Sequence, residues 1–310
     1  MLRYTIRRLV QGIITVWFIA TATFLAMHMV PGDPLSGEKA TTDEIRQNLE
    51  AKYGLDQPIG TQYLIYIGNI AKGDLGISFT QKNREVNDII REHFPVSAAL
   101  GILAITFAAI GGILLGALTA LYRNKWPDAV IMLLVILGIS VPGFVFAAFS
   151  QLAIVKLNAL LGFSLLPVAG WGTVSHMIVP ALVLGLGTMA YLTRLMRSSM
   201  LEIVNADYIR TAHAKGLPPT RVFSRHQLRN AILPVVTVIG PAIAAITTGS
   251  FVIELVFAIP GLGRYFVQAV QQLDYTVIMG TTVFYGAFLV LMVIVVDLLY
   301  GLVDPRVRVD

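Results

Sequence analysis

Long apolar runs without charged residues constrain this chain more than any other feature of its sequence. Five of them, free of Asp, Glu, Lys and Arg, are residues 9–27, 95–121, 129–155, 231–253 and 275–296. A helix needs about 20 mostly apolar residues to cross a bilayer, where lipid offers unpaired backbone groups no hydrogen-bond partner. Another uncharged run contains the turn-rich segment 167–172 and then an apolar stretch, 177–193, which is fourth in chain order. The sequence therefore predicts an all-α integral membrane protein with six transmembrane helices.

Composition supports this class and argues against others. Hydrophobic residues occupy 56% of the 310 positions and charged residues only 13%, which is too apolar for a soluble domain of this length. The formal charge of +5 does not indicate a nucleic-acid partner, because Lys and Arg lie between the apolar runs and form no stripe with interleaved aromatics. The absence of cysteine excludes disulfides, thiolate metal ligands and a Cys nucleophile.

The distribution of Lys and Arg predicts the orientation in the membrane. With the N-terminus inside, the short inner segments contain more than half of these cations. The long segment 31–94 contains several more, but loops of this length count weakly and this one is also rich in acids. Both termini are therefore expected in the cytoplasm, and 31–94 is expected to be an extracytoplasmic loop subdomain.

The outer segment 31–94 carries two helix patterns. Thr41 and Glu44 have the spacing of a capping box, and the helix that they start would end near Gly54. A second helix over 58–72 would place apolar side chains on one face, against the membrane surface or a partner. The subdomain is either a small cap over the helix ends or a surface that receives a binding protein.

The inner loop 197–230 has the pattern of two short helices. The first, 207–215, would stop at Gly216, with Pro218 and Pro219 behind it. Thr220 would then cap a second helix that runs toward residue 230. A loop that served only as a topology signal would need neither the stop nor the cap, so the pattern favours a rigid docking element.

The same loop carries a family resemblance. The segments DYIRTAHAKGL at 207–217 and LRNAILP at 228–234 resemble the EAA-type loop of binding-protein-dependent ABC importers in its peptide-permease form. Residues 210–212 replace Glu-Ala-Ala and the gap after Gly216 is long, and both departures resemble the peptide subgroup. The resemblance implies that this loop forms coupling helices that fit into a cleft of an ATPase subunit. The implied coupling residues are Tyr208, Arg210, Thr211, Ala212, Ala214, Lys215, Gly216 and Leu217.

Further motifs extend the resemblance over nearly the whole chain. PGDP at 31–34, KYGLDQP at 52–58, GDLG at 73–76 and FPVS at 94–97 are similar to the outer region of the B-type subunits of oligopeptide permeases. Near the end, PGLGR at 260–264, DLLY at 297–300 and DPR at 304–306 are similar to the same family. One departure is Val293, where many relatives carry Asn. Dipeptide, nickel and opine permeases share these motifs, so the resemblance leaves the cargo open among them.

The resemblance implies an architecture and a set of partners. Residues 1–310 would form one transmembrane domain of a type I ABC importer in the bacterial cytoplasmic membrane, moving oligopeptides by alternating access. Its partners would be a homologous second permease subunit, two cytoplasmic ABC ATPases and an extracytoplasmic peptide-binding protein. ATP and magnesium would bind to the ATPases, and this chain would hold no cofactor, metal or catalytic residue.

Two other classes of function compete with transport driven by ATP. No G-x-x-x-x-G-K-[ST] run occurs, so ATP hydrolysis would fall to partner chains, and an intramembrane hydrolase would need a Ser or carboxylate beside His at span depth. A proton-coupled secondary transporter would need a buried carboxylate, for which Asp297 is the main candidate and Glu254 the second. Asp297 lies near the inner end of its span, where a structural hydrogen bond is expected, and no internal repeat is evident.

Several span residues are candidates for a moving pore. Gly112 and Gly116 have the spacing that lets helices approach closely, and Pro142 is expected to kink the third span. Hydroxyls in the fifth span would line a polar path, or would instead bond back to their own helix. The predicted translocation-path residues are Pro142, Thr247, Thr248, Ser250 and Glu254.

Overall fold

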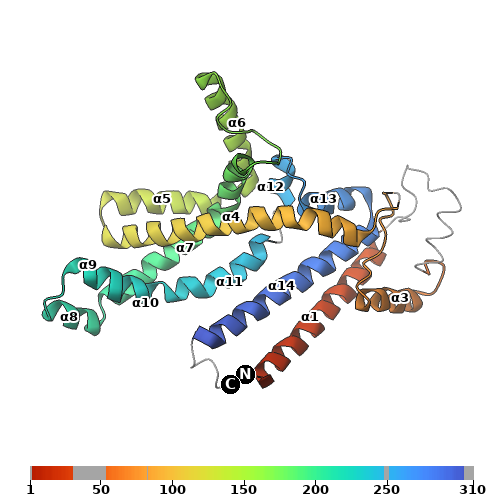
Figure 1. Cartoon of the computed structure of the whole chain (residues 1–310), viewed down its shortest axis with the longest axis horizontal. Helices are drawn as coiled ribbons and strands as arrows, with labels where there is room; N and C mark the ends of the chain where they lie inside the picture. The colour runs from red at the N-terminus through yellow and green to blue at the C-terminus, as the bar shows by residue number, and fades with distance from the viewer. Residues whose placement is uncertain (1, 31–53, 82, 248–250, 304–310) are drawn as a thin grey trace. The chain divides into compact units, whose positions relative to one another are not determined.

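The computed structural model describes residues 2–30, 54–81, 83–247 and 251–303 (Figure 1). Within these ranges the regular elements are helices, apart from one antiparallel bridge between Ile77 and Glu85. Five helices are long and apolar enough to cross a membrane, and a sixth span is present if the bent pair Pro219–Ala231 and Leu233–Thr247 counts as one. The five are α1 (Leu2–Met29), α4 (Val86–Leu121), α6 (Gly143–Leu161), α7 (Val174–Val204) and α14 (Tyr275–Val303).

The chain forms two compact units, and the first joins residues 1–96 to residues 260–310. In this unit α1 and α14 run side by side (Figure 1). Their close approach depends on small residues: a Cβ on Gly12 would lie 2.8 Å from Val290, and one on Gly286 would lie 2.6 Å from Ile19. The amphipathic helix α13 (Leu262–Gln272) packs on α14. The two ends of the chain thus build one unit together.

The predicted helix 58–72 is present as α3 (Ile59–Ala71), between its caps Pro58 and Lys72. Its apolar face lies on α1 of the same chain. The Tyr63 hydroxyl shares a hydrogen bond of 2.7 Å with Thr21, and Ile67 and Ile70 line an apolar cavity with α1 and α14. The other predicted helix of this segment, beginning at Thr41, lies outside the described residues.

A buried carboxylate, Asp274, joins two segments of the first unit that lie far apart in the sequence. Asp274 is 1% exposed and follows α13 after the left-handed residue Leu273. It accepts hydrogen bonds from the Ser78 hydroxyl, from the Thr80 hydroxyl at 2.8 Å and from the Phe79 amide at 3.1 Å. This one side chain therefore fixes the hairpin around residues 77–85 to the turn before α14.

The second unit comprises residues 97–259. In it α4 and α7 approach closely at the predicted Gly112 and Gly116 pair. A Cβ on Gly112 would lie 2.6 Å from the Leu192 Cβ, and one on Gly116 would lie 2.5 Å from the Met196 Cβ. Side chains at these two positions would push the helices apart, so the motif performs the packing role that its spacing predicts.

The predicted third span, 129–155, is not one kinked helix. It is divided into α5 (Trp126–Ser140) and α6, with Val141 and Pro142 in extended conformation between them. Proline disfavours helical backbone at the preceding residue and cannot donate to the helix behind it, so α5 ends here instead of bending. Because α6 runs on to Leu161, it is long enough to span alone, and α5 is a shorter apolar helix.

Two other predicted boundaries also differ. The apolar run of the second span begins at Pro95, but α4 begins earlier, at Val86, and includes Pro95. The fifth span, 231–253, is divided into α11 (Leu233–Thr247) and α12 (Phe251–Val256), with residues 248–250 outside the described part. Hydropathy located both regions but did not locate the ends of their helices.

Candidate functional site

The predicted docking helix is present as α8 (Asp207–Ala214). Gly216 follows it with φ of +71°, in the left-handed region. The Gly216 amide donates to the His213 carbonyl at 2.9 Å, and the Leu217 amide donates to the Ala212 carbonyl at 3.3 Å. These two bonds form a Schellman motif, which satisfies carbonyls that the end of the helix leaves unpaired. The sequence prediction of a stop at Gly216 is confirmed.

The eight predicted coupling residues divide into two groups. Ala212 is buried and Leu217 is half-buried, in a small core with Ile209 and Val222. This core holds α8 against the next helical segment, α9 (Pro219–Val222). The exposed coupling residues, besides the capping Gly216, are Tyr208, Arg210, Thr211, Ala214 and Lys215. Only these exposed side chains are free to meet another protein.

The second part of the loop differs from the prediction. Thr220 does not cap it, because α9 begins at Pro219 with Pro218 as its N-cap residue. The fixed φ of proline suits the first helical position, where an amide hydrogen is not needed. A π-helix, Phe223–Leu228, and a short α10 (Arg229–Ala231) follow. The Asn230 amide reaches back to the Tyr208 hydroxyl at 3.2 Å, so the two halves of the loop are joined at both ends. We call residues 207–231 the knob.

The knob continues directly from a long helix. Only Asn205 and Ala206 separate the end of α7 from the start of α8. Two turns before that end, Arg197 forms a bidentate ion pair with Asp128 at the start of α5, with both bonds at 2.8 Å. Asp128 precedes the apolar run, and the Arg197 guanidinium holds the pKa of this carboxyl below its usual range. The pair ties α5 to the helix that carries the knob.

The predictions did not include this pair. Asp128 and Arg197 lie 69 residues apart, and each resembles an ordinary charge at the inner end of a span. The signal that could have found it is a lone acid in the first turn of an apolar helix, where the cost of desolvation requires a partner.

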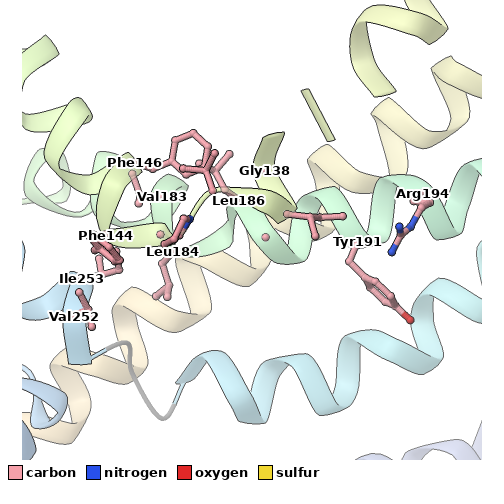
Figure 2. Close-up of a pocket in the computed structure, with 15 residues that line it drawn as sticks. Gly138, Phe144, Phe146, Val183, Leu184, Leu186, Tyr191, Arg194, Val252 and Ile253 are labelled. Carbon is pink, nitrogen blue, oxygen red and sulfur yellow. The ribbon is translucent and has the colours of Figure 1, made fainter. Parts of the chain in front are cut away.

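A cavity of about 520 Å³ lies in the second unit (Figure 2). It is lined by the break between α5 and α6, by one face of α7 and by α12. The predicted path residue Pro142 is among its lining residues, beside Phe144. Its volume falls within the range of about 300–1,000 Å³ that is usual for small-molecule sites, and its walls are mainly apolar. The break between α5 and α6 therefore forms part of the wall of this cavity.

Of the other predicted path residues that the structure describes, Thr247 and Glu254 are not among the residues that line this cavity. Thr247 is 2% exposed, and its hydroxyl donates to the carbonyl of Ile243 in its own helix at 2.6 Å. Glu254 is fully buried and accepts a hydrogen bond of 2.7 Å from the Ser97 hydroxyl. Thr248, Ser250 and the side chain of Asp297 lie outside what the structure describes. A path along Thr247, Thr248, Ser250 and Glu254 stays a prediction.

Comparison with known proteins covers almost the entire chain. Residues 112–309 match the family described as "Binding-protein-dependent transport system inner membrane component", and residues 1–101 match its N-terminal companion family. The dipeptide transport system permease protein DppB of Bacillus subtilis is 46% identical over 310 residues, covering 99% of this chain and 98% of that protein. The oligopeptide transport system permease protein OppB of Escherichia coli K12 is 40% identical over 311 residues, covering 99% of this chain and 100% of that protein.

Proposed function

Because the chain belongs to the family of binding-protein-dependent transport system inner membrane components, we propose that it is the peptide-conducting permease subunit of an ATP-driven importer in the bacterial cytoplasmic membrane. The observation that carries the proposal is its match, at 40–46% identity over nearly full length, to permease proteins named for dipeptide and oligopeptide transport. The chain itself is a permease component and not a catalytic subunit.

The knob is the part of the chain through which an ATPase acts. Its exposed coupling side chains lie on α8 and at its C-cap Lys215, and its buried core and Schellman motif make it a rigid body. A rigid element at the end of α7 transmits a displacement to the helix that lines the cavity, because a packed core does not deform continuously. Two ATPases, a second permease subunit and an extracytoplasmic peptide-binding protein complete the importer that we propose.

The cavity beside Pro142 is the section of the peptide path that this subunit contributes. Peptides share a backbone and differ in side chains, so a roomy and weakly polar cavity suits a cargo of variable sequence. The binding protein then determines most of the specificity, and alternating access opens the cavity to each side in turn.

The test is uptake by the complete importer in proteoliposomes. We expect tripeptide accumulation that requires both enclosed ATP and the binding protein, and that persists when an ionophore collapses the proton gradient. Uptake that stopped on collapse of the gradient while ATP was maintained would instead support proton coupling through Asp297. Asp297→Asn serves as the companion variant, because it removes the titratable group and retains the shape of the side chain.

A further inference from the structure

One face of α7 forms a continuous wall of the cavity. Leu184, Gly187, Tyr191 and Arg194 all line it, and their spacing of three or four residues places them on the same side of the helix. Figure 2 shows Tyr191 and Arg194 together at one end and Phe144, Val252 and Ile253 at the other. Arg194 lies toward the end of α7 that continues into the knob.

Arg194 is the one charged residue among the residues that line this cavity. Its side chain is exposed, and no acid in the described part of the chain forms an ion pair with it. Arg197, one turn further along, is different because Asp128 occupies its guanidinium. A guanidinium offers five donors in a fixed planar fork, so Arg194 brings unused donors to an otherwise apolar wall.

We propose that Arg194 binds the C-terminal carboxylate of the cargo peptide at the end of the cavity nearer the knob. The inference rests on the proposed function, and it adds a specificity-determining residue. A carboxylate is the one anionic group that every linear peptide with a free C-terminus carries, and it matches the guanidinium fork in a bidentate pair. The apolar walls contact side chains without selecting among them.

The dimensions of the wall agree with such a cargo. The ten residue steps from Leu184 to Arg194 extend about 15 Å along the helix. An extended peptide covers about 3.3–3.6 Å per residue, so about four residues fit between the apolar end and the guanidinium. A peptide held in this way has its C-terminus toward the knob.

The first experiment compares two cargoes that differ only at the C-terminus. The complete importer in proteoliposomes, with saturating binding protein, is given an alanine tripeptide either as the free acid or as the C-terminal amide. Saturation keeps the preference of the binding protein constant between permease variants. The quantity measured is the ratio of initial uptake rates, acid to amide.

We expect Arg194→Gln to lower this ratio about three- to tenfold relative to wild type, the range for losing one partly solvated charge-assisted bond. Arg194→Lys keeps the charge but cannot form the bidentate pair, so we expect its ratio to lie between those of wild type and Arg194→Gln. The matched control is Arg123→Gln, which removes an exposed cation between α4 and α5 that does not line the cavity. We expect this control to leave the ratio unchanged.

The second experiment needs no variant. A tripeptide with a photoreactive C-terminal residue should label the segment around Tyr191 and Arg194, and one with a photoreactive N-terminal residue should label the segment around Val252. Equal labelling by both peptides would overturn the inference.

The outcomes separate this inference from the function on which it rests. An unchanged acid-to-amide ratio in Arg194→Gln, with normal membrane abundance and peptide-stimulated ATP hydrolysis, would overturn the role of Arg194 and leave the permease assignment intact. That result would mean that Arg194 only meets lipid headgroups. Absence of peptide uptake by the wild-type complex would instead overturn the proposed function.

Discussion

Gly216 offers the sharpest test of the knob, because its substitution isolates one physical effect. Its φ of +71° is left-handed, and no atom lies within 4 Å of the position that a Cβ would take. A side chain therefore has room, and the whole cost of adding one is conformational. This separates Gly216 from helix-packing glycines, where a side chain would collide with a neighbour.

The magnitude follows from that conformation. Left-handed backbone costs a residue with a Cβ about 1–2 kcal/mol, and a β-branched residue is a stronger outlier there. If Gly216→Val leaves this region, it avoids that strain but loses the Schellman bonds to His213 and Ala212, at about 0.5–1.5 kcal/mol each. Either cost is about 2 kcal/mol, which lowers the ratio of correctly formed to misformed knob about 30-fold.

The assay combines three measurements in one strain: membrane abundance, ATPase pull-down and peptide uptake. We expect Gly216→Val to insert normally, because spans form their backbone hydrogen bonds internally, but to bind ATPase weakly and import poorly. Gly216→Asn is the matched control, since Asn adds a side chain yet tolerates left-handed backbone. Wild-type pull-down and uptake by Gly216→Val would refute the reasoning and reduce the loop to a topology signal.

Three further predictions concern packing, electrostatics and topology. Gly116→Leu should destabilise the fold by about 1–3 kcal/mol through overpacking and so lower the folded yield in detergent. Gly68→Leu, with no atom within 4 Å of its added Cβ, should leave the yield unchanged, and equal yields of the two variants would contradict the close contact. Asp128→Asn should destabilise the protein by about 1–3 kcal/mol. This is less than the cost of breaking a fully buried ion pair, because the Arg197 side chain is 25% exposed. Adding Arg197→Leu should partly restore the melting temperature, since it removes the cation left without its partner. A reporter fused after Lys215 should give a cytoplasmic signal, and an external signal would overturn the orientation.

Local signals in the sequence predicted local structure well. Pro58 and Lys72 bounded a helix that proved to be α3, and the Gly-Leu-Pro-Pro stop located the end of α8. Both depend on backbone chemistry within a few residues. The helix break at Pro142 was expected only as a kink, since hydropathy is continuous across it and a residue count does not reveal that α6 is long enough to span alone.

The candidate site was less predictable, because its parts meet across the chain. Arg194 appeared in the sequence only as the first cation of an inner segment, and its place on the cavity wall depends on how α7 is turned against α5 and α12. The ion pair between Asp128 and Arg197 was missed for the same reason, because its two residues lie 69 positions apart. For Thr247 the sequence left two roles open, and the structure shows its hydroxyl bonded back to its own helix.

The Asp274 network has a consequence for the order of biogenesis. The ribosome makes Ser78 and Thr80 almost 200 residues before the carboxylate that fixes them, so the hairpin that they form has no anchor during most of synthesis. It becomes fixed only when the segment leading into α14 has been inserted and α14 can join α1. A proteinase added from outside should therefore cut residues 77–85 in chains truncated before Asp274 and spare them in the complete chain. Protection of this hairpin from the proteinase would therefore show that insertion of the chain has finished.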